Sequence, residues 1–495
     1  MVADTPIPLQ AATTADCTRR VSTPTYDRSE ISTGIVHFGV GGFHRAHQAM
    51  YLDRLLERGT AREWGICGVG VLPGDRRMRD VLAAQDGLYT LSTVTPDGTW
   101  TTRVIGSIVE YRYAPDDPEA VLEKLAASTT RIVSLTITEG GYHIAAATGE
   151  FDAGDPAIRA DLRADAPPAT VFGLVTEALA RRRARGVAPF TVMSCDNIEG
   201  NGHVARRMFA AFATLRDPEL GAWVTDQVRF PNSMVDRITP VTPPEATGEV
   251  ERRYGVSDRW PVLAEPYTQW VLEDSFGLGR PAFDEVGVQL VADVAPYELM
   301  KLRLLNASHQ ALCYLGYLSG YRLVHEAAQD PAFARFLSRY MDTEATPTLR
   351  AVPGVDLGRY KQTLLERFAN PAIGDTIARL CAESSDRIPK WLLPVVRHQL
   401  AAGGDIACAA TVVAGWARYA AGVDEQGEPI EIVDPLRDLL VPLARQERER
   451  PTAFLGARAV FGDLIDEPRF VTAYLAAMDS LRTRGARATV EALAG

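Results

Sequence analysis

The stretch GIVHFGVGG, residues 34–42, decides the fold of the N-terminal half. It opens with apolar and β-branched residues, which are typical of a buried strand, and it ends in a glycine turn. RAHQAMYLDRLLERG (45–59) then has the pattern of an amphipathic helix, and WGICGVGV (64–71) that of the next strand. A strand, a helix and a second strand in succession predict a right-handed crossover and therefore a parallel sheet.

The same alternation continues along the chain as far as residue 296. Helices are expected at 121–128 and 170–186, and strands at 131–142, at the start of 189–202 and within 284–296. Strand signals nearly stop after that point, and the remainder has the pattern of helices joined by loops. The predicted fold class is α/β: a Rossmann-type parallel-sheet domain over residues 1–295, followed by a mainly α-helical domain over residues 296–495.

Composition and charge exclude several kinds of partner. The chain has 495 residues, 46% of them hydrophobic and 23% charged, as in ordinary globular proteins. Its net charge of −11 argues against nucleic acid or an anionic membrane surface, because binding phosphates requires concentrated Lys and Arg. Neither a signal peptide nor a long apolar run is visible, and the six cysteines lack CxxC spacing. We therefore expect a cytoplasmic protein with reduced thiols, no membrane partner and no zinc site.

The glycine turn predicts a dinucleotide site. The backbone of Gly39, Gly41, Gly42 and Phe43 would approach a pyrophosphate at the N-terminus of a helix. The third position of the usual G-x-G-x-x-G pattern is His44, so the fingerprint is incomplete.

Asp75, after the second strand, would accept hydrogen bonds from the adenosine ribose; the alternative is an ordinary loop aspartate. His44 and His47 are spaced as a metal pair would be, but no third ligand follows at an obvious spacing. A cap or a phosphate contact is the commoner reason for such a pair.

Three polar loops are expected to close strands of this sheet: TEGGY (138–142), SCDNIEGNG (194–202) and FPNSMVDRITP (230–240). Ligands of open parallel sheets gather beyond the carboxyl ends of the strands. Asn197 would donate a hydrogen bond to an oxygen that acquires negative charge. Asp236 would bind sugar hydroxyls, although an Asp–Arg pair in a turn is the commoner explanation of VDR.

A lysine stands out in the C-terminal half. YELMKLRLLNASHQALCYLGYLSGYRLVHE (297–326) predicts one long helix, with Lys301, Asn306 and His309 on the same leucine-rich side. Only four of the 52 basic residues are lysines, which gives one at this position particular weight. Arg stays protonated, whereas a desolvated Lys can lose its proton and act as a base. The alternative is a polar cluster within a core.

Several motifs, in this order, make the chain resemble the polyol-specific long-chain dehydrogenases, and within them the mannitol 2-dehydrogenases. They run from about residue 30 to near the C-terminus and include GVGGFHRAHQAMYLDRLL, SLTITEGGY, TVMSCDNIEGNG, PNSMVDRITP, EPYTQWVLEDSF, ELMKLRLLNASHQALCYLGYLSGYR and VPGVDLGRYKQTLLERFAN. The resemblance implies an NAD-binding Rossmann-type domain, a helical substrate and catalytic domain, no catalytic metal, and a monomer.

The resemblance also assigns roles to residues. Lys301 matches the catalytic lysine, Asn197 and Asn306 the oxyanion-stabilising asparagines, and His309 the substrate-positioning histidine. Asp236 and Arg379 match residues that contact polyol hydroxyls. Two positions depart from the family: Arg387 stands where a lysine is frequent, and Gly74 replaces the first of two adjacent acids that some relatives carry.

The expected reaction is the reversible, NAD-dependent oxidation of a linear polyol to the 2-ketose, with Lys301 as general base. D-mannitol and D-fructose are the first pair, and D-arabinitol and D-xylulose the second. A fructuronate or tagaturonate reductase of the same superfamily is an alternative, because Arg379, Arg387 and Lys390 would suit a substrate carboxylate. An epimerase, or a non-catalytic protein that binds sugar or nucleotide, is the alternative from another class.

Overall fold

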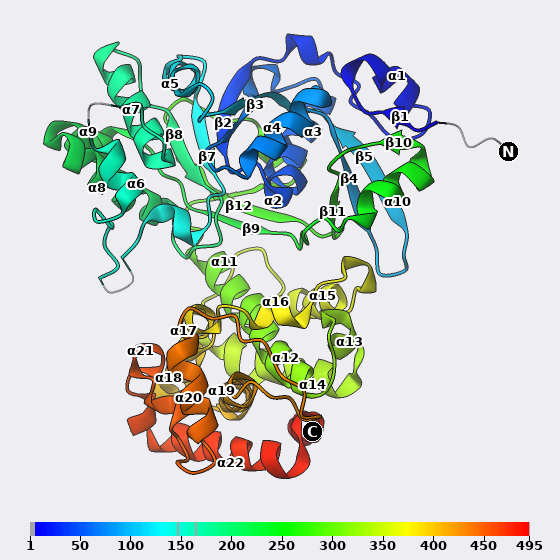
Figure 1. Ribbon diagram of the computed structural model, residues 1–495, viewed down its shortest axis with the longest axis vertical. Coiled ribbons are helices and arrows are strands. Elements are labelled where there is room, and N and C mark those ends of the chain that lie inside the picture. Colours follow the sequence, from blue (N-terminus) through cyan, green and yellow to red (C-terminus); the bar gives the residue numbers. More distant parts are fainter. Residues whose placement is uncertain (1–4, 146–147, 164–165, 495) are drawn as a thin grey trace. The chain divides into compact units, whose positions relative to one another are not determined.

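The chain forms two compact units, Met1–Ala295 and Pro296–Gly495, which are described separately below. The computed structural model describes residues 5–145, 148–163 and 166–494, and Figure 1 shows the elements of each unit. Within these residues, no helix is both long enough and apolar enough to cross a membrane.

A five-stranded sheet organises the first unit, and all its neighbouring strands are parallel. Its order is β6-β3-β2-β7-β8, with β2 Thr33–Phe38, β3 Gly65–Gly70, β6 Ile108–Tyr113, β7 Ile132–Leu135 and β8 Thr191–Ser194. Four of these strands are buried throughout their length, as expected for a sheet covered on both faces. The order reverses direction on either side of β2, which creates a switch point between β2 and β7. The predicted α/β fold class is confirmed.

Helices follow the strands of this sheet (Figure 1). They are α2 Gly42–Ala46, α3 Gln48–Glu57, α4 Asp75–Ala84, α5 Pro118–Ala126, α6 Pro156–Asp161, α7 Val171–Ala184, α8 Asn201–Arg216 and α9 Pro218–Gln227. The prediction of a single helix over 45–59 was wrong. The backbone of His47 leaves the helical region (φ −125°, ψ −90°) and divides it into α2 and α3.

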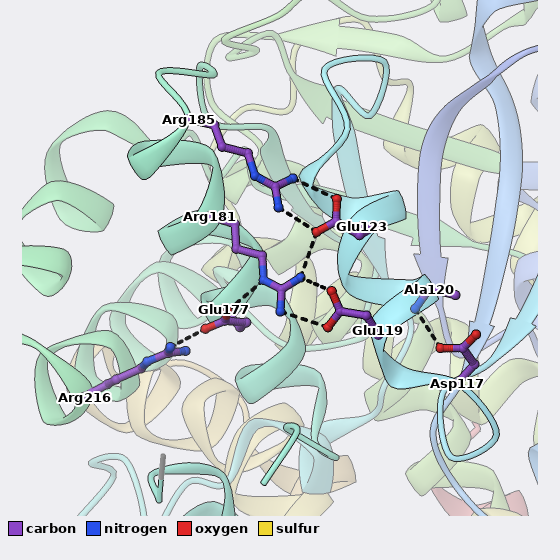
Figure 2. A network of polar contacts seen from close by, with 8 residues as sticks. All are labelled: Asp117, Glu119, Ala120, Glu123, Glu177, Arg181, Arg185 and Arg216. Carbon is purple, nitrogen blue, oxygen red and sulfur yellow. Dashed lines mark hydrogen bonds and ion pairs between the residues drawn. The ribbon is translucent and has the colours of Figure 1, made fainter. Parts of the chain in front are cut away.

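A network of ion pairs joins α5 to α7 on the surface of this unit (Figure 2). Arg181 bonds to Glu119, Glu123 and Glu177, and Arg185 forms two further bonds to Glu123. Exposed arginines are thus neutralised by carboxylates of a neighbouring helix.

Two three-stranded sheets accompany the main sheet. One has the order β11-β4-β5, with β4 Tyr89–Val94, β5 Trp100–Ile105 and β11 Val262–Ala264; the other has the order β13-β12-β9, with β9 Ser233–Asp236, β12 Gln269–Glu273 and β13 Gln289–Val291. The prediction that residues 230–240 form a loop at the main sheet was wrong, because Ser233–Asp236 pairs with β12 instead. The strand expected over 131–142 also ends early, at Leu135.

Near the N-terminus, β1 Ile7–Pro8 pairs with β10 Val256–Ser257, beside the short helix α1 Thr14–Cys17 and α10 Glu245–Tyr254.

The second unit is helical. Its elements are α11 Ala295–Met300, the π-helix η6 Lys301–Asn306, α12 Ala307–Leu318, α13 Val324–Gln329, α14 Pro331–Arg339, the π-helix η7 Tyr340–Ala345, α15 Leu357–Phe368, α16 Ile377–Cys381, α17 Ser384–Trp391, α18 Leu393–Ala402, α19 Ala407–Ala420, α20 Arg437–Gln446, α21 Arg458–Phe461, α22 Pro468–Arg484 and α23 Ala486–Leu493. Almost every residue of α12 and α19 is buried, so these two helices form the core of the unit.

The long helix predicted over 297–326 is interrupted twice. It widens into a π-helix at Lys301–Asn306, and it ends at Leu318, before a turn that contains Gly320 with φ +94°. A positive φ is readily adopted only by glycine, which explains why the helix stops there.

Candidate functional site

The glycine turn lies at the switch point of the main sheet. Gly39 has φ +90°, and a Cβ at this position would lie 2.0 Å from the backbone oxygen of Thr136, just beyond β7. The hydroxyl of Thr136 donates a hydrogen bond to the carbonyl of Gly39 at 2.7 Å. Only glycine fits this close approach of two strand ends, so the turn is held where a ligand of such a sheet binds.

The start of α2 presents backbone donors. Its first intrahelical bond runs from the N–H of Arg45 to the carbonyl of Gly41, so the N–H groups of Gly42, Phe43 and His44 need partners from outside the helix. The nearest atom that a Cβ on Gly41 would meet is 3.8 Å away, which leaves the backbone open. Such a turn suits the pyrophosphate of a dinucleotide.

The two histidines of this segment serve the turn. The ring of His44 stacks on that of His37, with centroids 3.4 Å apart, and burial lowers the pKa of His37 to about 3 and that of His44 well below its usual value. His47 lies 2.9 Å from the carbonyl of Gln269 through Nε2. No group of three or more His, Cys, Asp or Glu able to hold a metal occurs among the described residues.

Asp75 begins α4 and supports the loop that follows β3. Its Oδ2 accepts hydrogen bonds from the N–H groups of Val71 and Leu72, both at 2.9 Å. Arg76 lies 3.9 Å from Asp116, and Arg77 stacks 4.2 Å from the ring of Trp260.

Sequence reasoning missed Asp196, which lies next to Asn197. The buried carboxylate of Asp196 accepts hydrogen bonds from the N–H of Thr138 at 2.7 Å and from the hydroxyl of Tyr142 at 2.8 Å. Thr138 has φ +62°, which is strained for a β-branched residue, and this bond helps to hold it there. Burial raises the pKa of Asp196 to about 6, although these hydrogen bonds act in the opposite direction. The loops that follow β7 and β8 are therefore joined by one carboxyl group.

Asn197 and Asp236 follow or end strands of different sheets. Asn197 is exposed on the loop after β8, at the same sheet edge as the glycine turn, whereas Asp236 is buried at the end of β9. The buried amide of Asn201 connects the two segments, because it donates to the carbonyl of Ser233 and accepts from the N–H of Ser233. Asn201 therefore has a structural role, because it joins the start of α8 to β9.

Lys301, Asn306 and His309 lie on one continuous helical segment. Lys301 and Asn306 are the first and last residues of η6, with 9% and 6% of their surface exposed. The backbone bonds of a π-helix join residues five apart, so these two side chains lie nearly above one another, closer than an α-helix would place them.

Buried apolar residues belong to this segment. His309 is 9% exposed and its ring centroid is 4.3 Å from that of Phe368, and Leu302 and Leu305 are buried. The Oδ1 atom of Asn306 is buried and has no hydrogen-bond partner among the described residues. A buried amide oxygen of this kind suits a ligand hydroxyl.

The other three lysines have ordinary structural roles. Lys124, Lys361 and Lys390 form ion pairs with Glu110, Asp342 and Asp386, respectively. Lys301, in a leucine-rich stretch of the chain, is 9% exposed.

The two arginines with predicted substrate contacts bond to nearby groups of the helical unit in this structure. Arg379 forms a two-point ion pair with Asp375, and this pairing raises the pKa of its guanidinium. Arg387 bonds to Glu383 at 3.0 Å and to the carbonyls of Arg379 and Leu380. They lie on α16 and α17, both of which contact α12.

A glycine turn at the switch point of a parallel sheet, with a buried lysine in a separate helical unit, defines a class of oxidoreductases that bind a dinucleotide. Comparisons with known proteins identify the family. Residues 33–285 match the mannitol dehydrogenase Rossmann domain, and residues 293–482 the mannitol dehydrogenase C-terminal domain. The chain belongs to the mannitol dehydrogenase family, which confirms the resemblance found in the sequence.

Individual relatives agree over nearly the whole length. A mannitol 2-dehydrogenase of Phaeosphaeria nodorum is 46% identical over 95% of this chain and 83% of that protein. The crystal structure of Pseudomonas fluorescens mannitol 2-dehydrogenase in a ternary complex with NAD and D-mannitol is 45% identical, with a TM-score of 0.89 over 98% of this chain and 99% of that one. A substrate-free D-sorbitol dehydrogenase is 38% identical, with a TM-score of 0.91 over 98% of this chain and 100% of that one.

Proposed function

We propose that this protein catalyses the reversible NAD-dependent oxidation of D-mannitol to D-fructose, with D-arabinitol and D-xylulose as a second pair. The observation that carries the proposal is the buried π turn with Lys301 and Asn306, in a chain 45% identical to a mannitol 2-dehydrogenase bound to NAD and D-mannitol. The unit 1–295 would bind the nucleotide, and the unit 296–495 would supply the base. The protein would work as a monomer in the cytoplasm. Its six free, buried thiols support the location, because thiols stay reduced there.

The residues of the glycine turn would hold NAD. The open backbone at Gly41 and the outward N–H groups of Gly42 and Phe43 fit a pyrophosphate, and Asp75 is the acid nearest to the end of β3 for the ribose hydroxyls. NAD, when bound, supplies the acceptor for the hydride that leaves the carbinol carbon.

The side chains of the chain handle the proton and the developing charge. Lys301 would act as the general base, and its Nζ would take the proton of the reacting hydroxyl. Asn197 and Asn306 would donate hydrogen bonds to the alkoxide oxygen as charge develops on it, and one such donor contributes roughly 3 kcal/mol. His309 would orient the hydroxyl.

The polyol chain would be bound through its hydroxyl groups by Asp236, Arg379 and Arg387. Both arginines already bond to carboxylates, Asp375 and Glu383, which reduces their attraction for a further anion. This arrangement supports an uncharged substrate over a uronate.

Replacing Lys301 with Ala tests the proposal. We expect kcat for mannitol oxidation to fall by about 10³-fold or more, as the loss of a general base allows, while the affinity for NAD is preserved. The rising limb of the pH–rate profile should also disappear. Near-normal turnover by Lys301→Ala would contradict the proposed role of the lysine.

A substrate panel separates the reductase alternative. We expect kcat/KM to be higher for D-fructose than for fructuronate or tagaturonate, measured by absorbance of the reduced nicotinamide. A higher value for a uronate would assign Arg379, Arg387 and Lys390 to the substrate carboxylate instead.

A further inference from the structure

A cavity lies within the helical unit, and none of residues 301–309 lines it. It has a volume of about 370 Å³ and is lined by residues of α19, α20, α22 and the segments that follow α19 and α20. Four arginines contribute to its wall: Arg418, Arg445, Arg448 and Arg482.

The cavity exists because its floor is made of small side chains. Ala417 and Ala421 at the end of α19, Ala444 of α20 and Met478 of α22 are among its lining residues. The opposite face of α19 carries Trp416, which stacks on Tyr314 of the core helix α12. The alanines thus leave an apolar hollow beneath the guanidinium groups.

The positive charge of this cavity is not neutralised by carboxylates in the way it is elsewhere. Arg445 donates to the carbonyl of Ala421 at 3.1 Å, and Arg482 to the carbonyl of Glu447. Within the described part of the chain, none of the four arginines forms an ion pair, in contrast to Arg181 and Arg185 in Figure 2.

Arg418 is the innermost of the four. Burial lowers the pKa of its guanidinium, and the neighbouring charges of Arg448 and Arg482 lower it further, while Glu425 acts in the opposite direction. Arg418 is half-buried, whereas Arg448 and Arg482 are exposed at the rim of the cavity, and an anion between the three would offset their mutual repulsion.

The carboxylates that border the cavity have other partners. Asp424 accepts from the N–H groups of Gln426 and Glu428 and pairs with Arg322. Glu447 accepts from the N–H groups of Thr452 and Phe454.

Glu425 likewise accepts from the N–H of Ala486 at 2.7 Å, at the start of α23. These acids keep their charge, and Glu425 and Glu447 act electrostatically on Arg418 and Arg482, so the four arginines exceed the three carboxylates by one charge.

We propose that this cavity binds a phosphate dianion, either free or as the phosphate group of a small monoester, through Arg418, Arg448 and Arg482, with any carbon chain over the alanine floor. One planar guanidinium group can donate two parallel hydrogen bonds to phosphate oxygens. Several guanidinium groups together compensate the free energy lost when the dianion leaves water. The site is separate from the proposed polyol site and does not rest on it.

The position of these arginines near helix ends offers a simpler explanation for part of the cluster. Basic residues in the last turn stabilise a helix dipole, and Arg445 does so where it bonds to the end of α19. Arg418 and Arg482 lie in the last turns of α19 and α22 in the same way, so this role accounts for the helical arginines one by one, but it requires neither Arg448, which follows α20, nor the hollow that all four line.

Binding to the enzyme saturated with NADH tests the proposal, because the cofactor then blocks phosphate from the glycine turn. Inorganic phosphate and glucose 6-phosphate are titrated separately by calorimetry at constant ionic strength. We expect one site with a Kd of about 1 mM or below for at least one of them. The tighter of the two identifies the source: glucose 6-phosphate if the floor takes a carbon chain, inorganic phosphate if it does not.

Two variants and a control decide whether the cavity is the site. Arg448→Gln/Arg482→Gln should weaken binding by about tenfold or more, since two charge-assisted contacts are lost. Ala421→Met should also weaken it, by filling the hollow without a change of charge. Arg207→Gln/Arg335→Gln removes the same charge from exposed positions elsewhere and should leave the affinity unchanged. Absence of binding by both ligands, or equal loss in the control, would overturn the proposal.

Discussion

The carboxyl group of Asp196 connects two loops at the edge of the main sheet, and its protonation should be visible in the stability of the protein. Its pKa of about 6, against an ordinary value of 3.8, means that the folded state holds the proton more tightly than the unfolded state. The free energy of unfolding therefore falls as the pH rises from about 4 to about 6, and is constant above that range. A shift of roughly two units corresponds to about 3 kcal/mol.

Asp196→Asn should remove this dependence, because the amide keeps an acceptor for the N–H of Thr138 and does not ionise. Denaturant unfolding between pH 4 and 8 measures it. We expect the variant to gain stability relative to the parent as the pH rises, reaching its full advantage near pH 6. A difference that does not vary with pH would show that the carboxyl group titrates alike in both states.

The choice between NAD and NADP depends on Gly74 and Asp75. A Cβ on Gly74 would meet no atom within 4 Å, so Gly74→Glu adds a second carboxylate without a clash. Its charge would repel the 2′-phosphate of NADP, and the ratio of kcat/KM for NAD over NADP should rise by about tenfold. Since Arg76 and Arg77 already contact Asp116 and Trp260, we expect NAD to be preferred in the unmodified enzyme.

Asp75→Asn should lower the same ratio and keep an acceptor for the loop amides of Val71 and Leu72. It is a cleaner change than Asp75→Ala, which would leave these two amides without their partner. If the unmodified enzyme prefers NADP, Arg76 and Arg77, and not Asp75, would contact the adenosine ribose.

Residues whose chemistry is unusual for their surroundings could be identified in the sequence. Lys301 was noticeable because it lies in a leucine-rich stretch of an arginine-rich chain. Asp196, by contrast, looked like one more loop acid, since its partners Thr138 and Tyr142 are more than 50 residues away in sequence. Contacts of that separation arise only when β7 and β8 pair.

The π-helix η6 determines how Lys301 is presented, and a second π-helix supports it. The buried hydroxyl of Tyr340, the first residue of η7, donates to the carbonyl of Arg303 at 3.3 Å. A π turn strains the regular helical bonding, so an outside donor to one of its carbonyls stabilises it.

Tyr340→Phe should therefore lower kcat for polyol oxidation about threefold to tenfold, the equivalent of one hydrogen bond, with KM for NAD unchanged. Tyr321→Phe is the matched control, because it removes a hydrogen bond to Asp330 on the same unit away from η6. An equal fall in kcat in both variants would mean that Tyr340 contributes only to stability.

The helix predicted over 297–326 exists only as far as Leu318, and its π-helical part, Lys301–Asn306, was not predicted. Periodicity identifies an apolar face, but an extra residue in one turn scarcely alters it, so the π-helix was invisible. The end at Leu318 depends on Gly320, a signal that the long apolar pattern outweighed. Boundaries of this kind are set by tertiary packing.

Across the whole chain, the alternation of strands and helices in the sequence predicted the fold class. The small sheets could not be predicted in this way. The antiparallel pair β4–β5 and the strand β9 are short, and β9 pairs with β12 more than 30 residues later. Its segment, with Asn232 and Asp236, looks like a polar loop when read alone. Local pattern cannot reveal a partner at that distance.

The last prediction concerns metals. The described residues contain no cluster of three metal-ligating side chains, and Nε2 of His47 lies at the backbone carbonyl of Gln269. In the proposed mechanism the amine of Lys301 takes the proton, so no Lewis acid is needed to acidify the alcohol. Mannitol oxidation should therefore continue at an unchanged rate after dialysis against EDTA, measured by formation of NADH. Activity lost on chelation and restored by zinc would contradict the mechanism.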